Sequence, residues 1–104
     1  MFDSKAKIKT RDLLRHIQTL GQNSSDRIVF GFQETEKELI TKFTVDTEDL
    51  INHDEWGVGL ENLLNNLYEI EFSLDRKAVD LAKDTIKECE MDFEQWTFIE
   101  ELVK

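Results

Sequence analysis

The sequence predicts a mainly α protein: a small antiparallel helical bundle of four to five helices, with residues 1–104 as a single domain. Three observations predict this fold class. Apolar residues recur at spacings of three and four over several long stretches, which is the period of an amphipathic helix. The chain has no proline, the residue that breaks helices most strongly. Its 104 residues suffice for one hydrophobic core.

The first predicted helix runs from Thr10 to Leu20. Gly21 follows directly, and glycine is the residue that most often stands just past the end of a helix. We therefore expect the helix to stop at Gly21 and residues 22–26 to form a loop. The predicted apolar stripe of this helix consists of Leu13, Leu14, Ile17 and Leu20.

Residues 27–33 leave two interpretations open. Their β-branched and aromatic side chains favour a short strand. A run this short and apolar is equally typical of a buried helical segment. The apolar residues concerned are Ile28, Val29, Phe30 and Phe32.

Two helices are predicted in the stretch that follows. The first spans Glu34 to Phe43, with its apolar side chains at Leu39, Ile40 and Phe43. The second is short and ends near residues 52–53. Its predicted N-cap is Asp46, which Val45 and Leu50 would bracket as the apolar pair of a hydrophobic staple.

The clearest helix begins at Glu55 or Trp56 and ends at Ile70. Its apolar stripe repeats every three to four residues, and polar residues occupy the opposite face. The stripe consists of Leu60, Leu63, Leu64, Leu67 and Ile70.

Two further helices complete the predicted bundle. Ser73 is the expected N-cap of a helix over residues 74–89, and Asp92 is the expected N-cap of the last one. The last helix should face inward through Trp96, Ile99, Leu102 and Val103.

Composition limits the function classes. The formal net charge of −10 argues against a nucleic-acid-binding module and against docking to an anionic membrane, because both need cations on the protein. Cys89 is the only cysteine, so no internal disulfide forms. With no apolar run of about 18 residues, we expect a soluble domain in the reduced cytoplasm.

The charge is spread unevenly along the chain. Residues 1–50 carry 8 Lys or Arg and 9 Asp or Glu, whereas residues 51–104 carry 5 and 14. The net charge is therefore −1 in the first half and −9 in the second. Such an asymmetry in charge indicates what kind of partner the protein could bind, and it does not indicate the fold.

Signatures of catalysis are lacking in the sequence. His16, His53 and Cys89 lie on separate predicted elements, without the spacing of a zinc site. Gly57 and Gly59 lack the third glycine of a phosphate-binding loop, and we expect them to pack a helix start against a neighbour. With 23 acidic residues, no single carboxylate pair is diagnostic. We expect neither an enzyme nor a cofactor.

The second half of the chain resembles a known family. Residues 50–69 read LINHDEWGVGLENLLNNLYE, and a short helix, an Asn-His turn and a GEWGxALENLxxNLYE-type helix are typical of MafI-type immunity proteins. The likeness continues through Ile70-Glu71-Phe72-Ser73-Leu74 to an aromatic-rich last segment, Trp96-Thr97-Phe98. It covers about the last half of the chain. Gly59 departs from the pattern, which has alanine there.

The resemblance implies an antitoxin. Such proteins are made alongside a secreted bacterial toxin of a polymorphic or contact-dependent inhibition system, and they bind its toxic domain in the cytoplasm, roughly one to one. The toxins include basic nucleases such as EndoU-type ribonucleases. An acidic helical surface would fill the RNA groove of such an enzyme.

The predicted contact surface is the polar face of the helix over residues 56–70 and the turn before it. Acidic side chains would pair with Lys or Arg of the toxin, while the amides and the tyrosine would form hydrogen bonds and a hot spot. The same spacing is also typical of any solvated helix face. The residues are Asp54, Glu55, Glu61, Asn65, Asn66, Tyr68 and Glu69.

Two alternatives remain open at this stage. The contact surface could instead lie on the next acidic stretch, at Asp80, Asp84, Glu88 and Glu90. The function could instead be that of an acidic helical adaptor or regulatory module that binds a basic segment of another protein.

Overall fold

The computed structural model describes residues 4–24, 28–29, 31, 33–91 and 93–103, and it confirms the predicted mainly α bundle. Within these residues there are four α-helices and a final 3₁₀ helix, and only isolated β-bridges. The helices are α1 (Lys5–Gln22), α2 (Glu36–Asn52), α3 (Trp56–Glu69), α4 (Arg76–Glu88) and η1 (Phe93–Leu102).

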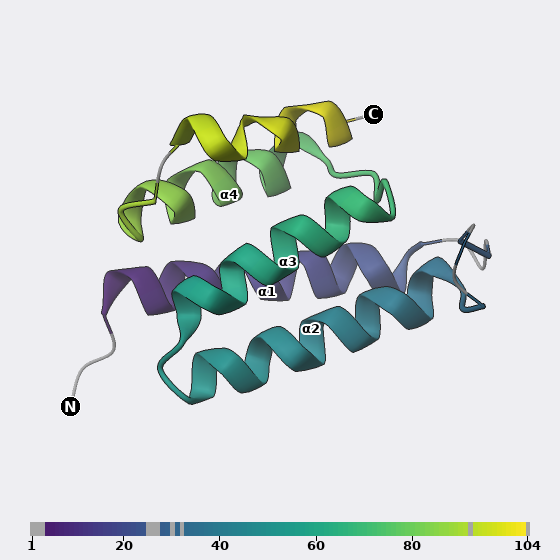
Figure 1. Cartoon of the computed structure of the whole chain (residues 1–104), viewed down its shortest axis with the longest axis horizontal. Coiled ribbons are helices and arrows are strands. Elements are labelled where there is room, and N and C mark those ends of the chain that lie inside the picture. Colours follow the sequence, from purple (N-terminus) through teal and green to yellow (C-terminus); the bar gives the residue numbers. More distant parts are fainter. Residues whose placement is uncertain (1–3, 25–27, 30, 32, 92, 104) are drawn as a thin grey trace.

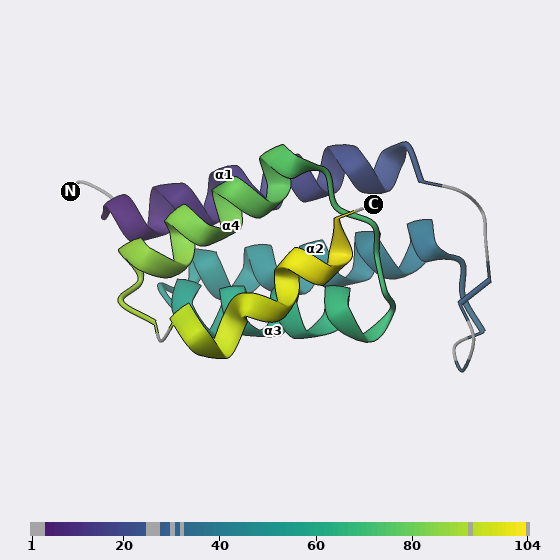
Figure 2. The same ribbon diagram turned by 90° about the horizontal axis from the view of Figure 1, so that it is seen from above.

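The helices enclose the core as a ring of neighbours. α2 packs between α1 and α3, α4 packs on the other side of α1, and η1 fills the space between α4 and α3 (Figure 1). Consecutive helices run in opposite directions. Seen from above, α1 and α4 form one layer, and α2 and α3 form the other (Figure 2). The face of α3 that points away from the core is therefore flanked by α2 and η1.

Aliphatic side chains from all five helices fill the core. Leucines dominate it, and α3 alone contributes four of them. The twelve largest side chains that are essentially inaccessible are Leu13, Leu14, Ile17, Leu39, Ile40, Ile51, Leu60, Leu63, Leu64, Leu67, Ile86 and Ile99. Every apolar stripe residue predicted for α3 is buried, including Ile70 just past its end.

The bounds predicted for α1 were wrong at both ends. The helix begins after Ser4, whose hydroxyl accepts a hydrogen bond from the Lys7 amide at 3.1 Å. Gly21 does not end the helix but lies within its last turn. A β-carbon at Gly21 would overlap Ile40 Cγ2 on α2. The glycine is there because the two helices come too close for any side chain.

The two helices predicted over residues 34–52 are one continuous helix, so the prediction of Asp46 as an N-cap was wrong. Thr35 is the N-cap, and its hydroxyl accepts from the Glu38 amide at 3.2 Å and donates to the Glu38 carboxylate at 3.0 Å. Nothing between Phe43 and Asp46 interrupts the backbone ladder. Val45, predicted to be half of a staple, is exposed.

Of the stretch from residue 27 to residue 33, the described residues 28–29, 31 and 33 form neither of the two structures considered. Ile28 and Thr35 make a single antiparallel bridge, and the Val29 amide donates to the Glu34 carbonyl at 3.2 Å. Val29 is buried, whereas Ile28 is exposed. Arg27, Phe30 and Phe32 lie outside the described residues.

The predicted packing role of the glycines in α3 is confirmed for Gly59 and wrong for Gly57. A β-carbon at Gly59 would lie 3.4 Å from both Leu50 Cβ and the Thr47 carbonyl oxygen of α2. A β-carbon at Gly57 would meet nothing within 4 Å. Of the two glycines, Gly59 is the one that packs against α2.

Three helices end in the same unusual way. The residue after each C-cap has a left-handed backbone and is acidic: Asp54 (φ 60°), Glu71 (φ 52°) and Glu90 (φ 56°). The next amide then donates to the carbonyl five residues back, in Glu55–Leu50, Phe72–Leu67 and Met91–Ile86, at 2.8 to 3.1 Å. Glycine usually occupies this position, and another residue there costs about 1 kcal/mol.

Asp75 caps α4, so the prediction of Ser73 was wrong. The Asp75 carboxylate accepts hydrogen bonds from the Ala78 amide at 2.8 Å and from His16 Nε2 of α1 at 2.9 Å. Ser73 cannot take this role because Leu74 is engaged with the end of the chain: its amide donates to the Leu102 carbonyl at 2.8 Å.

The last predicted helix exists, but as a 3₁₀ helix. Trp96, Ile99 and Leu102 are buried as predicted, and Val103 is half-buried. Its predicted N-cap, Asp92, lies outside the described residues. A parallel bridge between Leu74 and Val103 fastens the end of this segment beside the start of α4.

The close approach of α1 and α2 predicts a steep cost for Gly21→Ala. The new methyl group must displace Ile40, so we expect the free energy of unfolding to fall by about 1–3 kcal/mol in urea denaturation. Gly57→Ala is the matched control, because its added methyl group meets open space and alanine favours helix by about 1 kcal/mol. Equal effects of the two substitutions would contradict the packing explanation.

The cap at Asp75 predicts a pH-dependent loss of stability. The hydrogen bond from His16 is the main cause that lowers the pKa of Asp75; burial opposes it, and the Ala78 amide adds a smaller lowering effect. The charged carboxylate therefore stabilises the fold above its unfolded pKa of about 3.9, and that gain disappears as the pH falls through the lower folded pKa. Asp75→Ala should cost about 1 kcal/mol at pH 7.

Thermal unfolding from pH 7 down to pH 2 checks this prediction. The deficit of Asp75→Ala relative to the parent should shrink as the pH falls below about 4. Ser73→Ala, at the position that sequence reasoning chose, should leave stability unchanged. A deficit that stays constant with pH would show that the charge of Asp75 is not what stabilises α4.

Candidate partner-binding surface

The outward face of α3 carries most of the residues that the sequence predicted for partner binding. Glu61, Asn65, Tyr68 and Glu69 are exposed, and Asn66 is half-buried towards the α2 side. Asn62 and Val58, which sequence reasoning left out of the site, are exposed on the same face. Their signal was present in the helical spacing, since residues three and four apart share a face.

Cations are absent from a long stretch of sequence centred on this face. Residues 43–75 contain nine acidic side chains and no Lys or Arg. The stretch covers the second half of α2, all of α3 and the turns on both sides of α3. η1 adds three acidic residues and again no Lys or Arg. The second half of α2, all of α3 with its turns, and η1 therefore contribute acidic residues and no Lys or Arg, whereas the first half of α2 still holds Lys37 and Lys42.

The cations gather on the other layer. α1 carries five Lys or Arg against one Asp, and α4 carries four against three acidic residues. Together they hold nine of the 13 Lys and Arg of the chain. Because α1 and α4 lie side by side (Figure 2), the charge divides between layers of the fold rather than between halves of the sequence.

The turn before α3 holds Asp54 and Glu55 in different roles. Lys7 Nζ of α1 lies 2.7 Å from Asp54 Oδ1, and this hydrogen bond lowers the pKa of Asp54. Asp54 is therefore committed to fastening α1 to the turn. Glu55 precedes α3 without a side-chain capping bond and is exposed. Of the two acids, Glu55 is the one available to a partner.

His53 adds a titratable group beside this turn. Its Nδ1 lies 2.7 Å from the Asp49 carbonyl oxygen, and that hydrogen bond is the main cause that raises the pKa of His53. The nearby carboxylates of Asp49, Glu55 and Asp54 raise it further.

Tyr68 is exposed but held in one orientation. Its ring centroid lies 4.6 Å from that of Phe98, and its hydroxyl donates a hydrogen bond to Glu101 Oε2 at 3.1 Å. This bond to the carboxylate is the main cause that raises the pKa of Tyr68. Phe98 and Glu101 both come from η1, so the last helix positions the tyrosine of α3.

An open groove adjoins Tyr68 where α3 and η1 end. Glu69, Glu71, Glu101 and Leu102 complete its lining, and its volume is about 320 Å³. Glu71 and Glu101 were not among the residues predicted for the site. Glu71 lies three residues past Tyr68, whereas Glu101 reaches it only because η1 packs beside α3 and runs in the same direction, which local spacing in the sequence does not signal.

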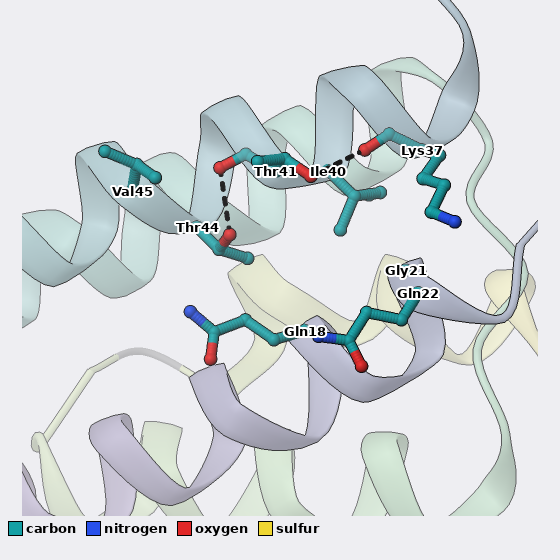
Figure 3. A pocket seen from close by; sticks show the side chains of 8 residues that line it. All are labelled: Gln18, Gly21, Gln22, Lys37, Ile40, Thr41, Thr44 and Val45. Carbon is teal, nitrogen blue, oxygen red and sulfur yellow. Dashed lines mark hydrogen bonds between the residues drawn. The ribbon is translucent and has the colours of Figure 1, made fainter.

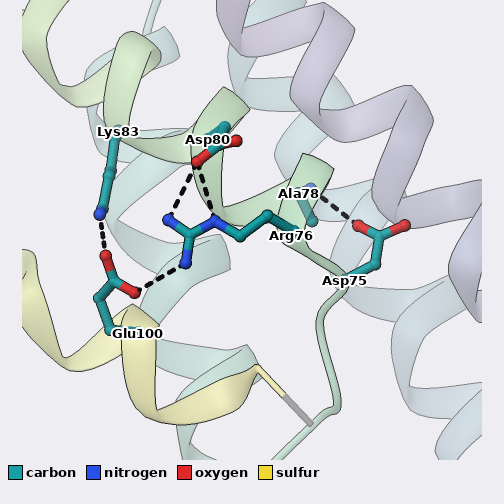
Figure 4. Close-up of polar contacts among 6 residues, drawn as sticks. All are labelled: Asp75, Arg76, Ala78, Asp80, Lys83 and Glu100. Carbon is teal, nitrogen blue, oxygen red and sulfur yellow. Dashed lines mark hydrogen bonds and ion pairs between the residues drawn. The ribbon is translucent and has the colours of Figure 1, made fainter.

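The alternative acidic residues lie on α4 among cations or at its end. Arg76 donates to Asp80 at 3.0 Å and to Glu100 at 3.1 Å, and Lys83 also pairs with Glu100, which links α4 to η1 (Figure 4). Asp84 lies near Lys9 in a small pocket between α1 and α4. The remaining two, Glu88 and Glu90, flank the end of α4. Each stands near cations or at a helix end.

A second groove lies between α1 and α2 and differs in character. It has a volume of about 280 Å³, and Gly21, Ile40 and Val45 are among the residues that line it (Figure 3). The hydroxyls of Thr41 and Thr44 are bonded to carbonyls of their own helix. Of the described residues in its lining, Lys37 is the only ionisable one.

Other side chains that could carry out chemistry lie elsewhere in the fold. Burial raises the pKa of Cys89, whose Sγ lies 3.8 Å from Thr10 Oγ1. Among the described residues no group of three or more His, Cys, Asp or Glu side chains is placed to hold a metal ion. Within the same residues, no helix combines the length and the apolar character that crossing a membrane requires.

Comparison of the chain with protein-family models, with curated protein sequences and with solved structures found no match. The likeness of residues 50–69 to MafI-type immunity proteins therefore rests on those residues themselves.

Proposed function

We propose that this protein is a bacterial immunity protein that binds a cognate toxin domain in the cytoplasm and neutralises it, with a basic ribonuclease as the expected kind of toxin. The contact surface is the acidic face, defined as Glu55, Glu61, Glu69, Glu71 and Glu101. The observation that carries the proposal is that α3, its flanking turns and η1 contribute acidic residues and no Lys or Arg of their own.

Charge complementarity gives this arrangement its physical purpose. An enzyme that cleaves RNA presents a groove of cations, and a helical face rich in carboxylates fits that groove in place of the phosphates. The opposite charges also raise the association rate, to about 10⁸–10⁹ M⁻¹s⁻¹ at low salt. Rapid capture matters for an inhibitor that must bind its target before the target acts.

The resemblance of residues 50–69 supports the same conclusion from a second direction. The stretch that is similar to immunity proteins contains most of the acidic face, together with the leucines that bury α3. A role as an acidic adaptor for a basic segment of another protein would use the same surface. The two functions differ in whether the partner is a toxin.

The first experiment tests this difference directly. The chain is co-expressed with the product of the adjacent upstream reading frame, the complex is purified, and its molecular mass is measured. We expect a roughly equimolar complex and protection of cells that express the toxin. Failure of the chain to protect such cells would overturn the immunity function, and stable binding to a non-toxic basic protein would favour the adaptor.

Charge reversal on the acidic face predicts slower binding. Glu61→Lys combined with Glu69→Lys should slow association with that partner about tenfold at low salt and flatten its salt dependence. The matched control is Asp12→Lys combined with Asp84→Lys, which changes the net charge equally on the α1–α4 layer. Stopped-flow association at several salt concentrations measures both. Equal slowing by the two pairs would contradict a localised acidic face.

A further inference from the structure

The groove beside Tyr68 stands out within the acidic face because it has a shape as well as a charge. Its walls are Tyr68, Glu69, Glu71, Glu101 and Leu102, which we call the Tyr68 groove. Tyr68 and Leu102 supply an aromatic and an apolar surface, whereas the other three supply carboxylates. A cationic side chain with a flat, weakly hydrated head matches such a mixture better than a compact ammonium does.

The tyrosine ring is prepared for a flat ligand. Contact with Phe98 and the hydrogen bond to Glu101 fix its position from two sides, yet 43% of the residue stays exposed. A fixed ring loses little conformational freedom when it is covered. Cations bind the faces of aromatic rings, and arginine does so more often than lysine.

Within the part of the chain that the structure describes, no cation satisfies the carboxylates of the groove. Among the described residues, Glu69, Glu71 and Glu101 take part in no ion pair with Lys, Arg or His. Glu71 also has the left-handed backbone, at φ 52°, that glycine would adopt without strain. A carboxylate is thus present at a position where glycine would serve the fold better.

We propose that the Tyr68 groove receives an arginine side chain of the bound partner, whose guanidinium stacks on Tyr68 and pairs with Glu71 and Glu101. This inference rests on the proposed function and names the point at which the acidic face anchors a basic partner. Arginine fits because its planar head stacks on a ring and donates to carboxylates at the same time. A second copy of this chain is an unfavourable occupant, because two chains of net charge −10 repel.

The first test uses the full-length protein and three short peptides. Acetyl-Gly-Arg-Gly-amide is titrated to about 10 mM while amide and aromatic resonances are followed, since a single side chain contributes little affinity. The lysine peptide and the neutral citrulline peptide are the comparators. We expect the arginine peptide to shift Tyr68, Glu71 and Glu101, the lysine peptide to bind more weakly, and the citrulline peptide to leave these resonances unmoved.

Substitutions at Tyr68 separate the ring from the hydroxyl. Tyr68→Ala should weaken binding of the arginine peptide about threefold to fivefold, the range expected for an exposed cation–ring contact. Tyr68→Phe keeps the ring and should bind within about twofold of the parent. Equal shifts with arginine and citrulline peptides, or shifts spread evenly to Glu61, would overturn the groove as an arginine site.

A pair of glycine substitutions tests the role of Glu71 without relying on loss of stability. Glu71→Gly and Glu90→Gly relieve the same left-handed backbone at the ends of two helices, so both should raise the melting temperature. Only Glu71→Gly should weaken binding of the arginine peptide. If both variants bind equally well, Glu71 has no part in recognition and the proposal fails.

The outcomes for the two proposals are separable. An arginine peptide that binds in the groove, with no protection against the toxin, would overturn the immunity function alone. Protection by a Tyr68→Ala, Glu71→Gly variant whose affinity for the toxin equals that of the parent would overturn the arginine site alone.

Discussion

The packing of α1 against two neighbours is the constraint on which the rest of the structure depends. On one side Gly21 lets α2 approach until Ile40 fills the space where a side chain would stand. On the other side the Thr85 hydroxyl reaches the Lys9 carbonyl at 3.4 Å, and His16 holds the carboxylate that caps α4. With α2 and α4 placed in this way, α3 and η1 close the ring on the side away from α1 (Figure 1).

That closure also decides where the charges lie. The helix with the most cations, α1, occupies the layer opposite α3, and α4 beside it carries the next largest number. The acidic residues of α3 and η1 thus remain on a surface of their own. Three cations of the other layer reach across: Lys7 fastens Asp54, and Arg76 and Lys83 pair with Glu100 of η1.

The sequence was enough to predict where the helices lie, but it predicted their first and last residues only in part. The leucine stripe of α3 predicted both the helix and its buried side, because apolar residues spaced three and four apart lie on one face only in a helix. Glycine often marks the end of a helix, but Gly21 is there because α2 packs against it. Aspartate often marks the start of a helix, but Asp46 lies inside the unbroken backbone hydrogen bonding of α2. Ser73 and Asp75 both carry the local signal of an N-cap, and the choice between them depends on the pairing of Leu74 with Leu102 and Val103, far along the chain.

The candidate surface was predictable to the same degree. Glu61, Asn65 and Glu69 could be placed on one outward face from their spacing alone. Glu101 and Phe98 could not, since they reach Tyr68 only through the return of η1 across 30 or more residues. Periodicity along the sequence describes one helix at a time. The groove is formed by two helices, α3 and η1, so periodicity does not predict it.

The separation of charge between the two layers gives the molecule an electric dipole in addition to its net charge. A net charge alone attracts a basic partner from any direction and leaves the inhibitor free to arrive with the wrong side forward. A dipole exerts a torque, so the field of a basic groove turns α3 and η1 towards it while α1 and α4 are turned away. If the partner is basic, as proposed above, the cations of the α1–α4 layer would take part in recognition without touching it, because they would make the opposite orientation unfavourable.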